Sequence, residues 1–222
     1  MPGRKVVFAS GEFYHIFNRG LNRQAIFKSK KDYERFIFTL KFYQFTPVPL
    51  RLSYFINLSK DKQKDLWQDI IKKPKLIKIV SFVLIPNHFH LILRQLLPKR
   101  ISLYLSLISN SYTRYFNLRY NRRGDLFEGV FKAVRIETEE QLIHLSRYIH
   151  LNPVVSYLIK EKELTTYPYS SLPDYLKKSS SFISTDLILK HFKTTKAYQK
   201  FIFDHVGYAK KLGRIKHLLL EK

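Results

Sequence analysis

Residues 77–94 read IKIVSFVLIPNHFHLILR, and this stretch decides the fold that the sequence predicts. Its first half, Ile77 to Ile85, is an apolar run rich in β-branched residues, which is typical of a buried strand. Pro86 and Asn87 then form a turn signal, and residues 88–94 return as a second strand. The stretch therefore predicts a β-hairpin whose second strand begins with two histidines.

Signals for further strands and helices lie on both sides of this hairpin. Residues 12–18 are rich in Phe, Tyr and Ile and predict a strand, and residues 50–58 and 126–136 are further strand candidates. Capping patterns and apolar spacing predict helices at residues 29–43, 61–73, 101–121 and 138–153, the last of which Pro153 is expected to end. Because hairpins and helices are mixed without strict alternation, we expect an α+β domain with an antiparallel sheet.

The composition carries a strong charge signal. Of the 222 residues, 40 are Lys or Arg and 17 are Asp or Glu, which gives a formal net charge of +23. Hydrophobic residues make up 45% of the chain, so a folded core is expected rather than general disorder. The positive excess favours a polyanionic partner, with nucleic acid as the first candidate and an anionic membrane surface as the second.

Two absences narrow the classes of function. The chain has no cysteine, which excludes disulfides, thiolate zinc sites and cysteine nucleophiles. Residues 1–10 hold no apolar core of a signal peptide, and the longest apolar run, residues 79–85, is too short to cross a bilayer. Secretion and membrane spanning are therefore disfavoured, and we expect a cytoplasmic protein. A role at a membrane surface is the weakest alternative, because the basic residues are spread along the chain and not gathered on one amphipathic helix.

His88 and His90 are the sharpest candidates for chemistry. Alternation along a strand puts both histidines on one face of the sheet and Phe89, Leu91 and Leu93 on the other. Two imidazoles that are two residues apart can both reach one metal ion. A His-x-His pattern is also common by chance on half-exposed strands, so the pattern alone leaves both interpretations open.

A second candidate pair lies on the helix predicted at residues 138–153. Tyr148 and Asn152 are one helical turn apart and project the same way. Tyrosine is most often a packing residue, and this chain has 15 of them. An asparagine before a proline is commonly a helix-terminal cap, so these two residues alone do not assign a function.

Five blocks in one order resemble the REP-associated tyrosine transposases, a branch of the single-tyrosine HUH transposases. The name HUH denotes histidine, hydrophobic residue, histidine, which His88-Phe89-His90 fits. The similarity covers about residues 11–173. The blocks are residues 13–20, 85–93, 115–117, 124–132 and 147–154, and Tyr169-Ser170-Ser171 adds a further similarity.

The resemblance implies a role for each matching residue. Tyr148 would be the nucleophile, His88 and His90 metal ligands, and Asn152 a third ligand. The implied cofactor is Mg²⁺ or Mn²⁺, and the implied substrate is single-stranded DNA beside a hairpin, cut with retention of the 5′ phosphate on the enzyme. The resemblance also implies a ferredoxin-like sheet with helices on one face, in a catalytic domain of residues 1–155. Residues 156–222 would be a connecting loop and a basic helical tail.

Basic residues around the proposed site are candidates for contacts with DNA phosphates, which would make binding salt-dependent. Nearby Tyr120 and Phe127 are candidates for stacking on unpaired bases. A solvated basic face is the simpler interpretation for any one of the cations. The basic candidates are Arg19, Arg23, Arg114, Arg119, Arg122, Arg123, Lys132 and Arg135.

Other interpretations stay open at this point. The chain resembles an active transposase but also fits a domesticated one that binds nucleic acid without cutting it. A related HUH nuclease of replication or plasmid transfer is a further alternative, although such enzymes often have additional domains. Residues 59–76 are expected to be a solvated surface helix rather than a DNA-specific insert. The protein is expected to be a monomer or a homodimer.

Overall fold

The hairpin predicted from residues 77–94 forms one half of the sheet. In the computed structural model, which describes residues 6–45, 48–177 and 182–211, strand β2 (Ile77–Ile85) pairs antiparallel with strand β3 (His88–Gln95). Ile85 lies opposite His88, so Pro86 and Asn87 form the turn as predicted. Almost every residue of β2 is buried, which explains its continuous apolar run.

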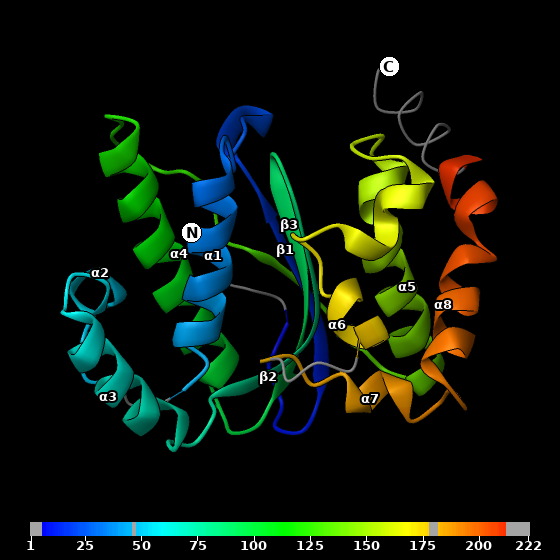
Figure 1. Ribbon diagram of the computed structural model, residues 1–222, viewed down its shortest axis with the longest axis horizontal. Coiled ribbons are helices and arrows are strands. Elements are labelled where there is room, and N and C mark those ends of the chain that lie inside the picture. Colours follow the sequence, from blue (N-terminus) through cyan, green and yellow to red (C-terminus); the bar gives the residue numbers. More distant parts are fainter. Residues whose placement is uncertain (1–5, 46–47, 178–181, 212–222) are drawn as a thin grey trace.

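Two more strands complete the sheet (Figure 1). Strand β1 (Phe13–Arg19) pairs antiparallel with β3, and strand β4 (Lys132–Ile136) pairs with the other side of β1. The order is β2-β3-β1-β4, so β3 is an inner strand. Only the last residues of the expected strand 126–136 join this ladder. The chain turns at Gly129, whose φ of 62° is a conformation that favours glycine, and Phe127 forms only an isolated bridge with Gly20.

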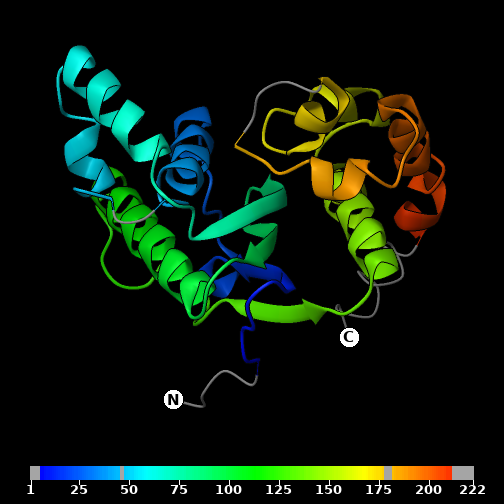
Figure 2. The same cartoon turned by 90° about the horizontal axis from the view of Figure 1, so that it is seen from below.

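Helices α1 (Lys30–Phe42) and α4 (Arg100–Arg119) cover one face of the sheet (Figure 2). The Asp32 side chain accepts a hydrogen bond from the Ser29 amide at 2.9 Å, which is one half of the capping box predicted for the start of α1. The interface is aromatic: the ring of Phe36 lies 5.1 Å from Phe89 of β3 and 4.9 Å from Tyr112 of α4. Helices α1 and α4 therefore pack on the face of the sheet that carries Phe89, which is opposite the face that carries His88 and His90.

Helix α5 (Glu139–Val155) covers the other face of the sheet (Figure 2). The Thr138 side chain accepts a hydrogen bond from the backbone amide of Gln141 at 3.1 Å, as the capping pattern predicts. The helix does not end at Pro153, so that prediction is wrong by two residues. A proline in the last turn removes one hydrogen bond, and the turn closes around it because the Ser156 amide donates to the Asn152 carbonyl at 2.8 Å.

The chain after α5 folds back onto the same layer (Figure 1). The expected connecting loop contains short helical segments, and Ser170 and Ile183 form isolated bridges with Val83 and Ile79 of β2. These bridges cover the outer edge of β2, which would otherwise expose unpaired backbone groups. The segments are 3-10 helix η2 (Glu161–Thr166) and helices α6 (Leu172–Lys177), α7 (Asp186–Leu189) and α8 (Thr195–Phe203). The expected basic tail continues past residue 211, outside the described residues.

Residues 50–58 do not form a strand, so that candidate is wrong. They contain helix α2 (Leu52–Phe55), in which Leu52 and Phe55 are both buried. Residues three apart share a face on a helix but take opposite faces on a strand. Helix α3 (Lys60–Ile71) follows as predicted, and its Trp67 ring lies 6.2 Å from the Phe55 ring. The only residue of α3 that is buried is Ile70, as expected for a surface helix.

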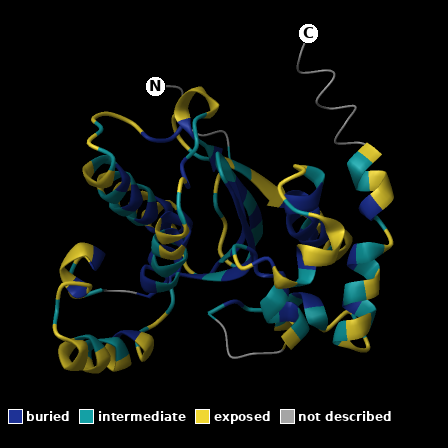
Figure 3. Cartoon of the chain, turned by 45° about the horizontal axis from the view of Figure 1, so that its top comes forward, coloured by how far each residue is buried: buried dark blue, intermediate teal, exposed yellow. Residues whose placement is uncertain are grey.

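Buried residues concentrate in the sheet and on the helix faces that meet it, whereas the outer faces are exposed (Figure 3). The predicted α+β fold with an antiparallel sheet is confirmed. Helices were expected on one face, but they cover both. Within residues 6–45, 48–177 and 182–211, no helix is long and apolar enough to cross a membrane.

Candidate active site

The sequence-predicted site residues meet on the face of the sheet that α5 covers. The ring of Tyr148 on α5 lies 5.6 Å from the ring of His90, at an interplanar angle of 85°. The His90 ring in turn lies 5.2 Å from the His88 ring. Strand alternation produces this arrangement, because Phe89 points into the aromatic core under α1 while its neighbours point toward α5.

Asn152 connects the tyrosine to the histidine pair. It is 5% exposed and lies close enough to both Tyr148 and His88 to shift their pKa values, lowering that of the tyrosine and raising that of the histidine. The hydroxyl of Ser156 donates to the Asn152 side-chain oxygen at 3.2 Å, which holds the amide in place. Because Asn152 lies one turn after Tyr148, the helix itself brings these two side chains together.

The His88 ring is held in a defined orientation. Its Nδ1 lies 2.7 Å from the Asn87 side-chain oxygen, so Nδ1 carries the proton in the neutral ring and Nε2 carries the lone pair. Burial lowers the pKa of His88, the Asn152 hydrogen bond partly offsets this, and the charge of Arg19 lowers the pKa further. His88 is therefore a neutral imidazole at neutral pH, the form that binds metal ions.

Tyr148 is 42% exposed, so a substrate can reach it. Burial of the rest of the side chain raises the pKa of the phenol, and the hydrogen bond from Asn152 opposes this rise. A phenol with a raised pKa is a weak nucleophile at neutral pH. A nearby cation would lower the pKa and increase the phenolate fraction.

His15 was not singled out from the sequence, although the structure places it in the same cluster. Its Nε2 lies 2.9 Å from Nδ1 of His90, and its ring lies 6.4 Å from the Tyr148 ring. Burial lowers the pKa of His15 to about 4, so this ring is neutral at neutral pH. Either His15 donates the hydrogen bond to His90, or His90 donates it to His15. His15 lies on the neighbouring antiparallel strand β1, on the same face of the sheet as His90. Placing it beside His90 requires the register between β1 and β3, which the sequence alone does not give.

The donor atoms fit a divalent ion only in part. Among the described residues, no group of three His, Cys, Asp or Glu side chains could hold a metal. His88, His90 and Asn152 would supply two imidazole nitrogens and an amide oxygen. This neutral set is weak for Mg²⁺ alone, and oxygen donors from phosphate and water would have to complete it.

Three of the basic candidates are engaged by carboxylates. Arg19 forms a two-point hydrogen-bonded pair with Glu128, and the arginine lowers the pKa of that carboxyl. Arg19 also lies opposite His88 in the sheet register. Ion pairs of 3.3 Å and 3.1 Å join Arg119 to Asp32 and Arg135 to Glu12.

The other basic candidates have more freedom to contact a ligand. Arg122 donates to the Asn117 side chain at 3.0 Å. The aromatic candidates differ: the Tyr120 hydroxyl donates to buried Asp32, whereas Phe127 is buried against Phe89. Phe127 therefore belongs to the core, and the expectation that it stacks on a base is wrong. Within the described ranges, no ion pair involves Arg23, Arg114, Arg123 or Lys132.

Comparison with solved structures shows what this fold is similar to. No protein-family model and no curated protein matches the chain. A solved structure of a REP-associated tyrosine transposase bound to a REP hairpin matches with a TM-score of 0.54 and 16% sequence identity. The match covers 82% of this chain and 90% of the other chain. The two proteins therefore share a fold over most of their length.

Proposed function

We propose that this protein is a metal-dependent, single-tyrosine nuclease and strand transferase that acts on single-stranded DNA beside a hairpin. One observation carries the proposal: Tyr148, His88, His90 and Asn152 meet in one cluster although they come from two distant segments of the chain. The shared fold with a hairpin-bound tyrosine transposase and the charge of +23 support it.

The proposed chemistry is a transesterification. The phenol oxygen of Tyr148 attacks the scissile phosphorus, a new P–O bond to tyrosine forms, and the P–O3′ bond breaks. The phenol gives up its proton, the leaving oxygen takes one up as a free 3′-OH, and the 5′ phosphate stays on Tyr148. Because one phosphodiester replaces another, a different 3′-OH can reverse the step without ATP.

The four residues of the proposed site, and the two that orient its histidines, each have a role in this step. His88 and His90 would hold a divalent ion, with Asn87 and His15 fixing the two rings by hydrogen bonds. Such an ion would polarise the scissile phosphate and neutralise developing charge. Asn152 aligns the phenol with His88. Tyr148 is 42% exposed, which leaves its side chain accessible to a substrate.

The test is covalent capture of the product. The protein is incubated with Mn²⁺ and a hairpin DNA that has labelled single-stranded flanks, and adducts are separated on a denaturing gel. We expect an adduct with the wild type and with Tyr208→Phe, since Tyr208 is a 60% exposed tyrosine of the C-terminal segment. We expect none with Tyr148→Phe.

The outcomes separate the proposal from its alternatives. An adduct that persists in Tyr148→Phe would show that another residue is the nucleophile. Tight DNA binding without any adduct in the wild type would instead favour the domesticated, non-catalytic protein.

We further propose that Tyr148 serves the histidines of its own chain, because its ring packs on His90 of the same chain. Mixing Tyr148→Phe with His88→Ala protein tests this. Two inactive variants that stay inactive together support one complete site per chain. Recovery of adduct in the mixture would show that two chains share the site.

A further inference from the structure

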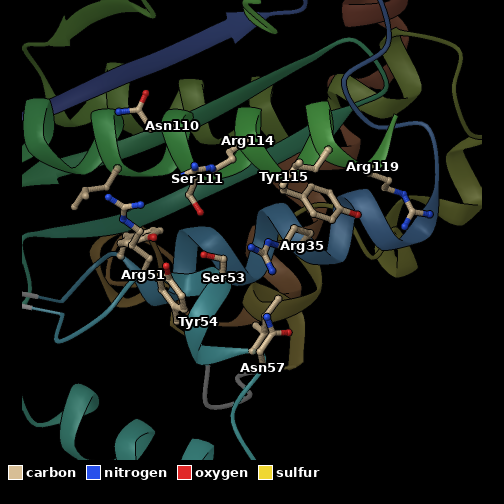
Figure 4. Close-up of a pocket in the computed structure, with 14 residues that line it drawn as sticks. Arg35, Arg51, Ser53, Tyr54, Asn57, Asn110, Ser111, Arg114, Tyr115 and Arg119 are labelled. Atoms are coloured by element: carbon tan, nitrogen blue, oxygen red, sulfur yellow. The ribbon is translucent and has the colours of Figure 1, made fainter. Parts of the chain in front are cut away.

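A groove of about 910 Å³ lies between α1, α2 and α4 (Figure 4). Its helices belong to the layer on one face of the sheet, whereas Tyr148 belongs to the layer on the other (Figure 2). Figure 4 shows Arg51, Ser53 and Tyr54 on one side of the groove and Asn110 and Arg114 on the other. The groove is therefore a separate surface that the proposed chemistry does not use.

Four arginines line this groove: Arg35, Arg51, Arg114 and Arg119. No Asp or Glu is among the lining residues. Where the structure describes the chain, Arg119 is the only one of the four that has a carboxylate partner, Asp32 at 3.3 Å. The groove thus gathers three arginines that have no carboxylate partner among the described residues, which suits an anionic ligand.

Arg35 is a half-buried cation in the wall of this groove. Its Nε is buried and has no hydrogen-bond partner within the described part of the chain. Its guanidinium lies 5.1 Å from the Tyr115 ring, and burial lowers the pKa of the group. Buried N–H groups normally have an acceptor. Because this Nε is shielded from solvent, it belongs to the wall of the groove and is not a contact point for a ligand.

The rest of the lining is aromatic and apolar rather than purely charged. Tyr54 is 64% exposed and Leu118 is 79% exposed, although both lie among the arginines. Asn57 and Asn110 add amides that can both donate and accept hydrogen bonds. Cations that hold phosphates beside aromatic rings that stack on bases are the combination that binds unpaired nucleotides.

We propose that the groove between α1, α2 and α4 binds an unpaired, single-stranded segment of nucleic acid. Its arginines hold the phosphates, and Tyr54 stacks on a base. An acidic peptide would use the arginines but would gain little from the exposed tyrosine and the amides. This inference does not depend on cleavage, because it concerns binding at a different surface.

The loop after α4 offers a route from this groove to the cleavage site. Arg122 and Arg123 directly follow α4 in the sequence. The backbone amide of Leu21 donates to the carbonyl of Leu126 at 2.9 Å, which fixes this loop beside the end of β1. Arg19 at that end lies opposite His88. Basic residues therefore continue from the end of α4 to the end of β1.

The proposal is tested by binding alone, in EDTA, with a fluorescein-labelled dT12 oligonucleotide as the probe. For single strands, each phosphate contact contributes about 0.7 to the slope of log K against log salt. The double variant Arg51→Gln, Arg114→Gln should therefore lower the slope by about 1.4 and weaken binding roughly 25-fold at 0.1 M salt. Tyr54→Ala should weaken binding roughly 5- to 150-fold with no change in slope.

The matched controls remove two cations and, separately, one tyrosine from the opposite layer. Lys162→Gln with Lys196→Gln deletes two exposed cations that have no ion pair among the described residues. Tyr208→Ala removes a tyrosine as exposed as Tyr54. All the substituted side chains are exposed, so circular dichroism should show folded protein in every case. We expect the controls to bind dT12 within about twofold of wild type, since single exposed charges contribute little.

Two results would overturn the proposal. Groove variants that lose no more dT12 affinity than the controls would show that single strands bind elsewhere. A 12-residue polyglutamate peptide serves as the second probe. If the groove variants weaken its binding while leaving dT12 binding unchanged, the occupant is an acidic peptide. Because no divalent ion is present, a failure here is distinct from a failure to form the tyrosine adduct.

Discussion

Helix α5 carries two tyrosine–histidine networks, one on each side, and they lie in opposite environments. On one side Tyr148 packs on His90 at the surface, and the tyrosine is 42% exposed. On the other side His150 is fully buried, and its two ring nitrogens lie 2.8 Å from the Tyr198 and Ser171 hydroxyls. Tyrosine and histidine thus form an open cluster around Tyr148 and a sealed cluster around His150, which lie two residues apart on α5.

The difference shows what separates a structural polar network from a reactive one. The sealed network satisfies both nitrogens of His150 and lets α8 and the Ser171 segment close over α5, so its polar groups fix a unique packing. The open network leaves the Tyr148 side chain accessible, and burial lowers the pKa values of His88 and His15 so that both rings are neutral. We therefore expect changes in the sealed network to alter stability and changes in the open network to alter chemistry.

The largest expected effect is loss of stability in His150→Ala. The change leaves a buried cavity and removes one hydrogen-bond partner from each of two buried hydroxyls, which should lower the free energy of unfolding by about 3–5 kcal/mol. His88→Ala is the matched change in the open network and should lower it by no more than about 1 kcal/mol. Urea unfolding at pH 7 measures both. Equal losses in the two variants would mean that the open network is as structural as the sealed one.

Asn152 offers the next effect, on the proposed metal site. Asn152→Ala removes a third ligand and the link between Tyr148 and His88, so the Mn²⁺ concentration for half-maximal adduct formation should rise by roughly 10- to 100-fold. Asn152→Asp keeps the shape and adds a charged oxygen, which should lower that concentration. Adduct titrations over Mn²⁺ check both. If neither variant shifts the titration, Asn152 only orients the tyrosine.

The third effect is acid destabilisation from His150. Burial lowers the pKa of His150 to about 3, whereas the unfolded residue titrates near 6.5. Below pH 6.5 the unfolded chain therefore binds more protons, and stability is lost as the pH falls from about 6.5 toward 3. At pH 5 the loss from this residue should be about 2 kcal/mol.

His150→Gln serves as the control for this pH dependence. Glutamine can still donate and accept hydrogen bonds but does not titrate. All other histidines are the same in both proteins, so the difference between wild type and variant isolates His150. The variant should lose about 2 kcal/mol less than wild type between pH 7 and pH 5 in urea unfolding. An identical loss in both proteins would rule out His150 as the source.

The sequence predicted the elements whose signals are local. The run Ile77 to Ile85, the Pro86-Asn87 turn and the caps at Ser29 and Thr138 each lie within a few residues, and the structure has these features where they were predicted. The side-by-side placement of His88 and His90 followed from strand alternation. That Tyr148 would face them came from a family resemblance rather than from periodicity.

The features that the sequence did not predict depend on contacts between distant segments. His15 joins the site only because the β1–β3 register sets Phe17 opposite His90 and so brings His15 beside it. Phe127 is buried because β4 begins later than its apolar pattern indicates. The groove needs α2 to pack near α4, and residues 50–58 did not reveal a helix. Such contacts arise from tertiary packing, which overrides local pattern.

The smallest expected effect is the change in stability when the hydroxyl of Tyr198 or of Tyr148 is removed. Tyr198→Phe removes one hydroxyl that lies 2.8 Å from His150 and 3.1 Å from the Ser146 hydroxyl. Ser146 keeps its bond to the Ile143 carbonyl at 2.7 Å, so the cost falls mainly on His150 and should be about 1–2 kcal/mol. Tyr148→Phe removes a partly exposed hydroxyl and should change stability by about 0.5 kcal/mol or less. Adduct formation should show the reverse order, with Tyr198→Phe active and Tyr148→Phe inactive. If Tyr148→Phe is the less stable protein, its lost activity reflects unfolding, and the division between the two sides of α5 does not hold.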